Sequence, residues 1–163
     1  MENIVRFKPV VLSTLLDLSN KHAQEVRDKL QPIFSDLQID DLYLDGQEFV
    51  SGNEASGRFI QSSICIANVG LRLQEIVRFL SFKPDYRKMI IVVTDYYTKS
   101  DSFFINNIFN SCKNMKEDLD FYFVKIGKSD PEFEKIALSY QRSYYFEKMD
   151  DLIDRVRSNN EIW

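Results

Sequence analysis

The sequence contains little glycine, proline, cysteine or histidine. Of its 163 residues, 5 are Gly, 4 are Pro, 2 are Cys and 1 is His. A chain with so few flexible and helix-breaking residues, of which 44% are hydrophobic, is neither disordered nor fibrous, and it has the composition of a compact globular protein. Its length fits one ordinary domain, so we expect residues 1–163 to form a single domain.

Further absences argue against several classes of function. Cys65 and Cys112 lie far apart and belong to no CxxC or His-spaced pattern, so we expect buried reduced thiols and no zinc or redox site. The net charge of −4 argues against a nucleic-acid partner, because binding to the phosphate backbone depends on Lys and Arg. No glycine-rich loop follows a strand pattern, and no serine lies in a nucleophile-elbow context. We therefore expect a protein that is not an enzyme.

The chain also lacks a long apolar run near its amino terminus. In "MENIVRFKPVVLSTLLD", charged residues precede an apolar stretch that is too short for the core of a signal peptide and far too short to cross a bilayer. This pattern favours a soluble cytoplasmic protein that has no membrane partner.

What is present is an alternation of strand and helix patterns. Asp45-Gly46, between two short strand-like runs, is a strong signal for a β-hairpin, and Pro32 is expected to kink or divide the helix that contains it. Residues 53–67 show no clear pattern and are assigned to a loop. The predicted order is strand 9–17, helix 21–37, the hairpin within 40–52, helix 68–82, strand 89–94, helix 101–118 with a cap at Ser100 or Asp101, strand 119–127, helix 129–140, strand 143–146 and helix 148–158.

This order predicts an α/β fold with three layers, α/β/α. Strands that alternate with helices imply right-handed crossovers, and thus a doubly wound, mostly parallel sheet in which the hairpin adds one antiparallel edge strand. Ligands of such sheets bind beyond the carboxyl ends of the strands. Asp17 ends the first strand and Asp95 ends a later central strand. If these strands are neighbours, both carboxylates lie at one crevice at the rim of the sheet.

Two stretches of the sequence resemble the von Willebrand factor A (vWA) domain. "IIVVTD" is similar to the family's fourth strand, which ends in Thr-Asp. "FYFVKIGKSDPEFEKIALSYQRSYYFEKMDDLIDRV" is similar to its closing strand-helix-strand-helix, with an Ile-Gly strand end and an aromatic short strand before the final helix. The resemblance covers most of the chain and implies the vWA/Rossmann-like fold predicted above.

The resemblance also implies a place for a divalent cation, usually magnesium. In the family, its ligands come from an Asp-x-Ser-x-Ser loop after the first strand, from a Thr in a second loop and from the Asp of the fourth strand. Here Asp17, Ser19 and Asp95 match three of these positions. They are the candidate metal ligands, because hard cations prefer oxygen.

Other positions depart from the family pattern, and the site that they imply is degenerate. Lys21 stands at the third position of the first loop, Ala67 stands where the Thr is expected, and Tyr96 replaces the Gly that commonly follows the Asp. We therefore expect no metal cofactor, with magnesium as the alternative. One hypothesis is that the Lys21 ammonium takes the cation's place and neutralises Asp17 and Asp95, two carboxylates that would otherwise repel each other. Asp95 could equally cap the turn that follows its strand.

The rim loops are also the candidate partner surface. His22, beside the crevice, is interpreted as a solvated or hydrogen-bonded residue and not as a catalyst. Tyr96 and Tyr97 are of the kind enriched at protein interfaces, although one of them could pack back onto the adjacent helix. Phe103 or Phe104 could extend this surface. The candidate partner-binding residues are Lys21, His22, Ala67, Asn68, Asp95, Tyr96 and Tyr97.

The resemblance implies a non-catalytic scaffold or assembly module that binds another protein through these loops. The alternative is a magnesium-dependent adhesion or regulatory domain in which Ser62 or Ser63 replaces the missing Thr. A phosphatase or receiver-type enzyme with Asp17 or Asp95 as nucleophile is less favoured, because the second aspartate of the dehalogenase-like phosphatases is missing. A TIR-like domain is disfavoured, because residues 102–115 contain no glutamate.

Overall fold

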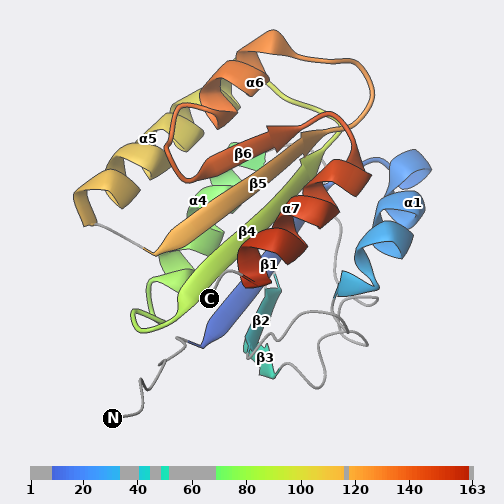
Figure 1. Ribbon diagram of the computed structural model, residues 1–163. Coiled ribbons are helices and arrows are strands. Elements are labelled where there is room, and N and C mark those ends of the chain that lie inside the picture. Colours follow the sequence, from blue (N-terminus) through green and yellow to red (C-terminus); the bar gives the residue numbers. More distant parts are fainter. Residues whose placement is uncertain (1–8, 34–40, 45–48, 52–68, 116–117, 162–163) are drawn as a thin grey trace.

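The protein has a six-stranded sheet with helices on both faces, as Figure 1 shows for this computed structural model. The structure describes residues 9–33, 41–44, 49–51, 69–115 and 118–161. The strand order is β3-β2-β1-β4-β5-β6, and every neighbouring pair is parallel except β2 and β3. The strands are β1 Val10–Asp17, β2 Asp41–Leu44, β3 Phe49–Ser51, β4 Arg87–Thr94, β5 Leu119–Lys125 and β6 Ser143–Phe146. The predicted α/β class and the antiparallel edge strand are confirmed.

The helices follow the predicted alternation. They are α1 Asn20–Leu30, α4 Val69–Leu80, α5 Lys99–Met115, α6 Pro131–Ala137 and α7 Met149–Glu161. As expected, α1 ends before Pro32, which has no backbone N–H to continue the helix. Asp130 caps α6 by accepting hydrogen bonds from two backbone N–H groups, and Pro131 begins that helix. None of the described helices is both long and apolar enough to cross a membrane.

The sheet separates two hydrophobic cores. Met89, Ile91 and Val93 of β4 pack with α1 and α7, whereas Ile90 and Val92 pack with α4, α5 and α6. This alternation follows from the two-residue period of a strand. Both faces of β4 are therefore covered, which explains why its sequence is a continuous apolar run.

The start of α5 differs from the prediction. The helix begins at Lys99, so Ser100 and Asp101 lie inside its first turn and not at its cap. The Asp101 carboxylate reaches back to the Thr98 backbone N–H at 2.9 Å and also accepts a hydrogen bond from the Gly70 N–H at 3.1 Å. At Gly70, α4 and α5 approach so closely that a Cβ atom would lie 2.8 Å from the Asp101 carbonyl oxygen. The carboxylate that resembles a cap in the sequence thus joins two helices.

Candidate functional site at the rim of the sheet

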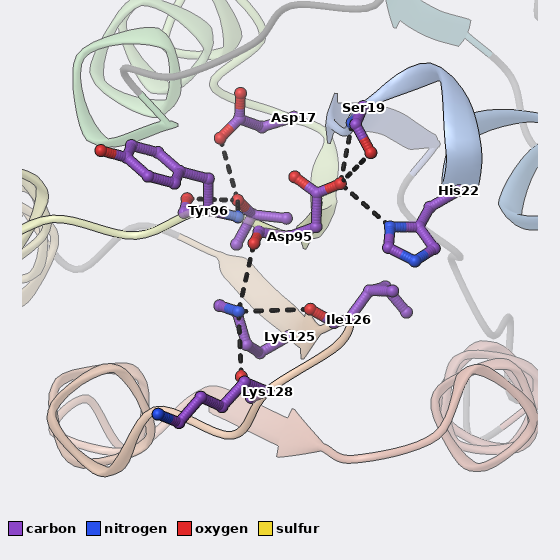
Figure 2. Close-up of polar contacts among 9 residues, drawn as sticks. Asp17, Ser19, His22, Asp95, Tyr96, Lys125, Ile126 and Lys128 are labelled. Atoms are coloured by element: carbon purple, nitrogen blue, oxygen red, sulfur yellow. Dashed lines mark hydrogen bonds and ion pairs between the residues drawn. The ribbon is translucent and has the colours of Figure 1, made fainter.

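The ends of β1 and β4 bring the two predicted carboxylates to the same rim. The strands are parallel neighbours, with Asp17 in register with Thr94, as the prediction requires. The Asp95 backbone N–H donates to the Asp17 carbonyl at 3.1 Å. The Thr94 hydroxyl lies 2.9 Å from Asp17 Oδ2 and 2.6 Å from the Tyr96 carbonyl oxygen, so its one proton is shared between two acceptors (Figure 2). Asp17 is buried.

One oxygen of Asp95 contacts two groups of Ser19, in the loop between β1 and α1, and one group of His22, in the first turn of α1. Asp95 Oδ2 lies 2.8 Å from the Ser19 backbone nitrogen, 2.7 Å from Ser19 Oγ and 3.0 Å from His22 Nδ1 (Figure 2). Ser19 precedes α1 at its N-cap position, but its hydroxyl accepts no capping bond; its proton is donated to Asp95. These contacts thus join the segment after β1 to the end of β4, two parts of the chain that are far apart in the sequence.

These contacts set the charge state of Asp95. Burial raises the pKa of this carboxyl group, but the hydrogen bond from His22 and those from the Ser19 backbone and side chain lower it by more. The net effect is a pKa below the ordinary value of 3.8. Asp95 is therefore an ionised carboxylate at neutral pH whose charge is stabilised by donors of the protein itself.

A buried lysine that the sequence interpretation missed fixes the backbone behind Asp95. Lys125 ends β5, and its Nζ donates to the carbonyl oxygens of Asp95 and Ile126, each at 3.2 Å, and of Lys128 at 3.0 Å (Figure 2). Its charge is thus used to join the end of β4 to the loop after β5. The only signal in the sequence is a lysine at the end of an apolar strand, which more commonly indicates a strand reaching solvent.

The two rim tyrosines have different environments. Tyr96 is 53% exposed. The Tyr97 ring stacks on Phe133 of α6, with 4.6 Å between centroids and 6° between planes, and its hydroxyl contacts Ser102. Burial, together with the nearby carboxylates of Asp101, Asp130 and Glu132, raises the pKa of Tyr97 to about 12. The sequence places both rings in the partner surface, whereas in the structure Tyr97 packs onto the adjacent helix and Tyr96 is the exposed ring of the pair.

Other predicted site residues are tested only in part. Ala67, Asn68, Ser62 and Ser63 lie outside the residues that the structure describes, and so does the side chain of Lys21, whose proposed role stays a prediction. Phe103 is 65% exposed and Phe104 is half-buried, which agrees with the expectation that one of them faces outward.

The described contacts do not form a coordination shell for a metal ion. Asp17, Ser19 and Asp95 come together, as the resemblance implies. However, the Ser19 hydroxyl donates to Asp95 Oδ2, and the Nδ1 atom of His22 occupies a further position on the same oxygen. Across the described ranges, no three His, Cys, Asp or Glu side chains are grouped so that they could hold a metal. Magnesium requires near-octahedral oxygen ligands, so further oxygens would have to join those of Asp17, Ser19 and Asp95 for this rim to hold it.

Asp95→Asn is expected to destabilise the protein by about 1.5–3 kcal/mol near neutral pH, because hydrogen bonds to a charged group are lost. The loss should shrink in acid. Since the folded-state pKa of Asp95 is lowered, its contribution is complete above about pH 4 and disappears as the pH falls through the folded-state pKa. Urea unfolding of both proteins from neutral to acidic pH measures this difference.

Asp28→Asn is the matched control, because Asp28 is an exposed carboxylate on α1, in the helix that contains His22. It should leave the pH profile of the wild type unchanged. A gap between the wild type and Asp95→Asn that stays constant into strong acid would contradict the assigned environment of Asp95.

Comparison with known proteins gives a match at the level of fold. No protein-family model matches the chain, and no curated protein does. Among solved structures, the chain is similar to the crystal structure of the manganese-loaded Plasmodium vivax TRAP protein, with 14% sequence identity and a TM-score of 0.63. The match covers 91% of this chain and 72% of that one. TRAP carries a vWA domain. The likeness supports a vWA/Rossmann-like α/β fold for this chain.

Proposed function

We propose that this protein is a non-catalytic module of the vWA type, a cytoplasmic scaffold or assembly domain that binds another protein. The binding surface consists of the rim loops after β1 and β4, at the carboxyl ends of the strands. Open α/β sheets bind ligands at this edge. A protein partner, rather than a nucleic acid or a membrane, fits the net charge of −4 and the exposed aromatic ring at the rim.

The observation that carries the proposal is a rim held by internal bonds that still exposes a large aromatic side chain. Asp95 is held by Ser19 and His22, and its backbone is held by Lys125. The next residue, Tyr96, is 53% exposed. A large aromatic ring on a preorganised surface is a common hot spot of protein interfaces, because little conformational entropy is lost on binding.

We infer that partner binding does not need a metal. The Asp95 oxygen that would face a cation already accepts hydrogen bonds from the protein, and Lys21 stands where the family has a ligand hydroxyl. The alternative, a magnesium-dependent adhesion or regulatory domain, is favoured by the likeness to a manganese-loaded protein of related fold. A chelator separates the two proposals.

The same geometry supports a non-catalytic role. Ser19, His22 and Asp95 contain the residue types of a hydrolytic triad, but the connections differ. A triad needs the serine hydroxyl to donate to the imidazole, whereas here both Ser19 Oγ and His22 Nδ1 contact the carboxylate. The proton of the Ser19 hydroxyl is thus directed at a weakly basic group, which does not generate a nucleophile.

The test is affinity purification from cells of the source organism with the tagged protein as bait. Tyr96→Ala should reduce recovery of the partner at least about tenfold, as expected for a hot spot of about 2 kcal/mol. Phe82→Ala is the matched control, because Phe82 is a 69% exposed aromatic residue at the other end of β4. The eight residues of that strand, at about 3.3 Å each, separate the two sites.

Chelation with EDTA should leave recovery of the partner by the wild type unchanged. Loss of the partner in EDTA, with restoration by magnesium, would support the adhesion alternative instead. Equal recovery of the partner by Tyr96→Ala and Phe82→Ala would show that the rim is not the binding surface.

A further inference from the structure

β6 forms one edge of the sheet, and among the described residues no strand pairs with its outer side (Figure 1). The phase of its pairing with β5 follows from the hydrogen bond that the Phe121 N–H donates to the Arg142 carbonyl. In a parallel ladder the backbone groups of successive residues face alternate sides, so those of Tyr144 and Phe146 face β5. The N–H and C=O of Tyr145 therefore point away from the sheet.

The short helix α6 borders this edge. Phe133 of α6 contacts the rings of Phe123 on β5 and Tyr145 on β6, with centroid distances of 5.8 and 5.9 Å. Leu138, the C-cap residue of α6, follows Glu134 by four positions and so lies on the same side of the helix. Both side chains are exposed, Leu138 by 53%. The helix thus presents one acidic and one apolar side chain along that side.

The charge around the Tyr145 side chain is negative. Burial raises the pKa of Tyr145, and the carboxylates of Glu134, Glu147 and Asp130 raise it further, whereas no cation of the described residues lowers it. Glu134 therefore lies on the side of α6 that faces the edge. A second copy of this chain would bring the same carboxylates together, and like charges on paired strands are destabilising. The complementary occupant is a strand of another protein that carries Lys or Arg.

The spacing of the two side chains on α6 matches that of a strand. Residues four apart in a helix are separated by about 6 Å along its axis. Residues two apart in a strand point to one face and are separated by about 6.6 Å. Because α6 connects the parallel strands β5 and β6, it runs back along them. One added strand thus reaches Glu134 with a basic side chain and Leu138 with an apolar side chain at the same time.

We propose that the outer edge of β6 binds an extended segment of a partner protein. The segment adds a strand to the sheet by hydrogen bonds to the N–H and C=O of Tyr145. It carries Lys or Arg against Glu134 and, two residues away, an apolar side chain against Leu138. In such complexes main-chain hydrogen bonds give affinity and alternate side chains give specificity. Because β5 separates β6 from β4, this surface differs from the rim loops after β1 and β4, and the proposal is independent of them.

The peptide acetyl-TVTKTVT-amide tests the site, because its central Lys has Val two residues away on both sides and so fits either strand direction. With a fluorescein label, it should show saturable binding to the full chain in fluorescence anisotropy. The matched acetyl-TVTETVT-amide should bind about tenfold more weakly. Glu134→Lys combined with Glu147→Lys should reverse this preference. Glu25→Lys combined with Asp28→Lys is the control, because it reverses two exposed carboxylates on α1 and should leave the preference unchanged.

Methylation of the peptide's backbone nitrogens separates strand addition from a general attraction of charges. A strand donates hydrogen bonds from alternate residues along each edge. Methylation of one alternate set of amide nitrogens should therefore abolish binding, and methylation of the other set should leave it within about twofold. No saturable binding of the Lys peptide, equal affinity for the Lys and Glu peptides, equal effects of the two methylated sets, or an unchanged preference in the folded Glu134→Lys, Glu147→Lys protein would each overturn the proposal.

Discussion

Asp120→Ala is expected to destabilise the protein by about 3–5 kcal/mol, because it leaves a buried charge without its partner. Asp120 is 3% exposed, and its two oxygens accept from Arg87 at 3.0 Å and from Arg142 at 2.7 Å. Arg87 is itself buried, at 6% exposed, and also donates to the Asn159 carbonyl of α7. Removal of the carboxylate therefore disturbs β4, β5 and α7 together.

Urea unfolding followed by circular dichroism measures this loss. The control is Asp150→Ala, which breaks the ion pair between Lys29 and Asp150. That pair spans 3.7 Å between side chains that are 41% and 77% exposed, and it should cost less than about 1 kcal/mol. Similar losses in the two variants would mean that the pair of Arg87 and Asp120 is solvated, contrary to the structure.

Phe109→Ala is expected to cost about 3–5 kcal/mol, because it opens a cavity in the core between α5 and the sheet. The Phe109 ring is 1% exposed. It packs edge-on against Phe121 and Phe123, at centroid distances of 5.1 and 6.2 Å, and stacks on Tyr140 at 5.2 Å. The variant therefore loses contacts with Tyr140, which follows α6, and with β5. We expect the midpoint temperature of its thermal unfolding to fall steeply.

Phe103→Ala is the matched control for this change. Phe103 lies in the same helix but is 65% exposed, and its substitution should cost less than about 1 kcal/mol. Differential scanning calorimetry of the two variants compares equal changes of side chain that differ in burial. A loss at Phe103 as large as that at Phe109 would show that the exposed face of α5 is covered in solution.

The apolar patterns were sufficient to predict the sheet, but not the ends of its strands. β4 was predicted to begin at Met89, whereas it begins two residues earlier, at Arg87. Charged residues such as Arg87 and Lys88 are typical of a strand that has reached solvent. Here both are buried, and Arg87 is stabilised by its ion pair with Asp120 of the next strand and by its hydrogen bond to the Asn159 carbonyl. A contact between residues 33 positions apart leaves no local signal in the sequence.

At the site, too, the positions of the strand ends could be predicted from the sequence, but the contacts between distant residues could not. The meeting of Asp17 and Asp95 could be predicted, because both end parallel strands. The groups that hold Asp95 could not, since Ser19 and His22 reach it across 76 and 73 positions of sequence by way of the particular path of the loop after β1. Among the described residues, the partners of Asp95 are a hydroxyl, a backbone N–H and an imidazole, with Lys125 bound to the carbonyl behind them. The role predicted for the Lys21 ammonium stays a prediction, because that side chain lies outside the described residues.

The Asp95 carboxylate is held by the protein's own donors, and we propose that the rim does not require a divalent cation. Isothermal titration calorimetry with manganese and with magnesium tests it most directly, with Asp95→Ala as the comparison. We expect no binding in the micromolar range and the same weak, nonspecific heats for both proteins. Micromolar binding to the wild type that disappears in Asp95→Ala would contradict it, and would make the rim a metal site.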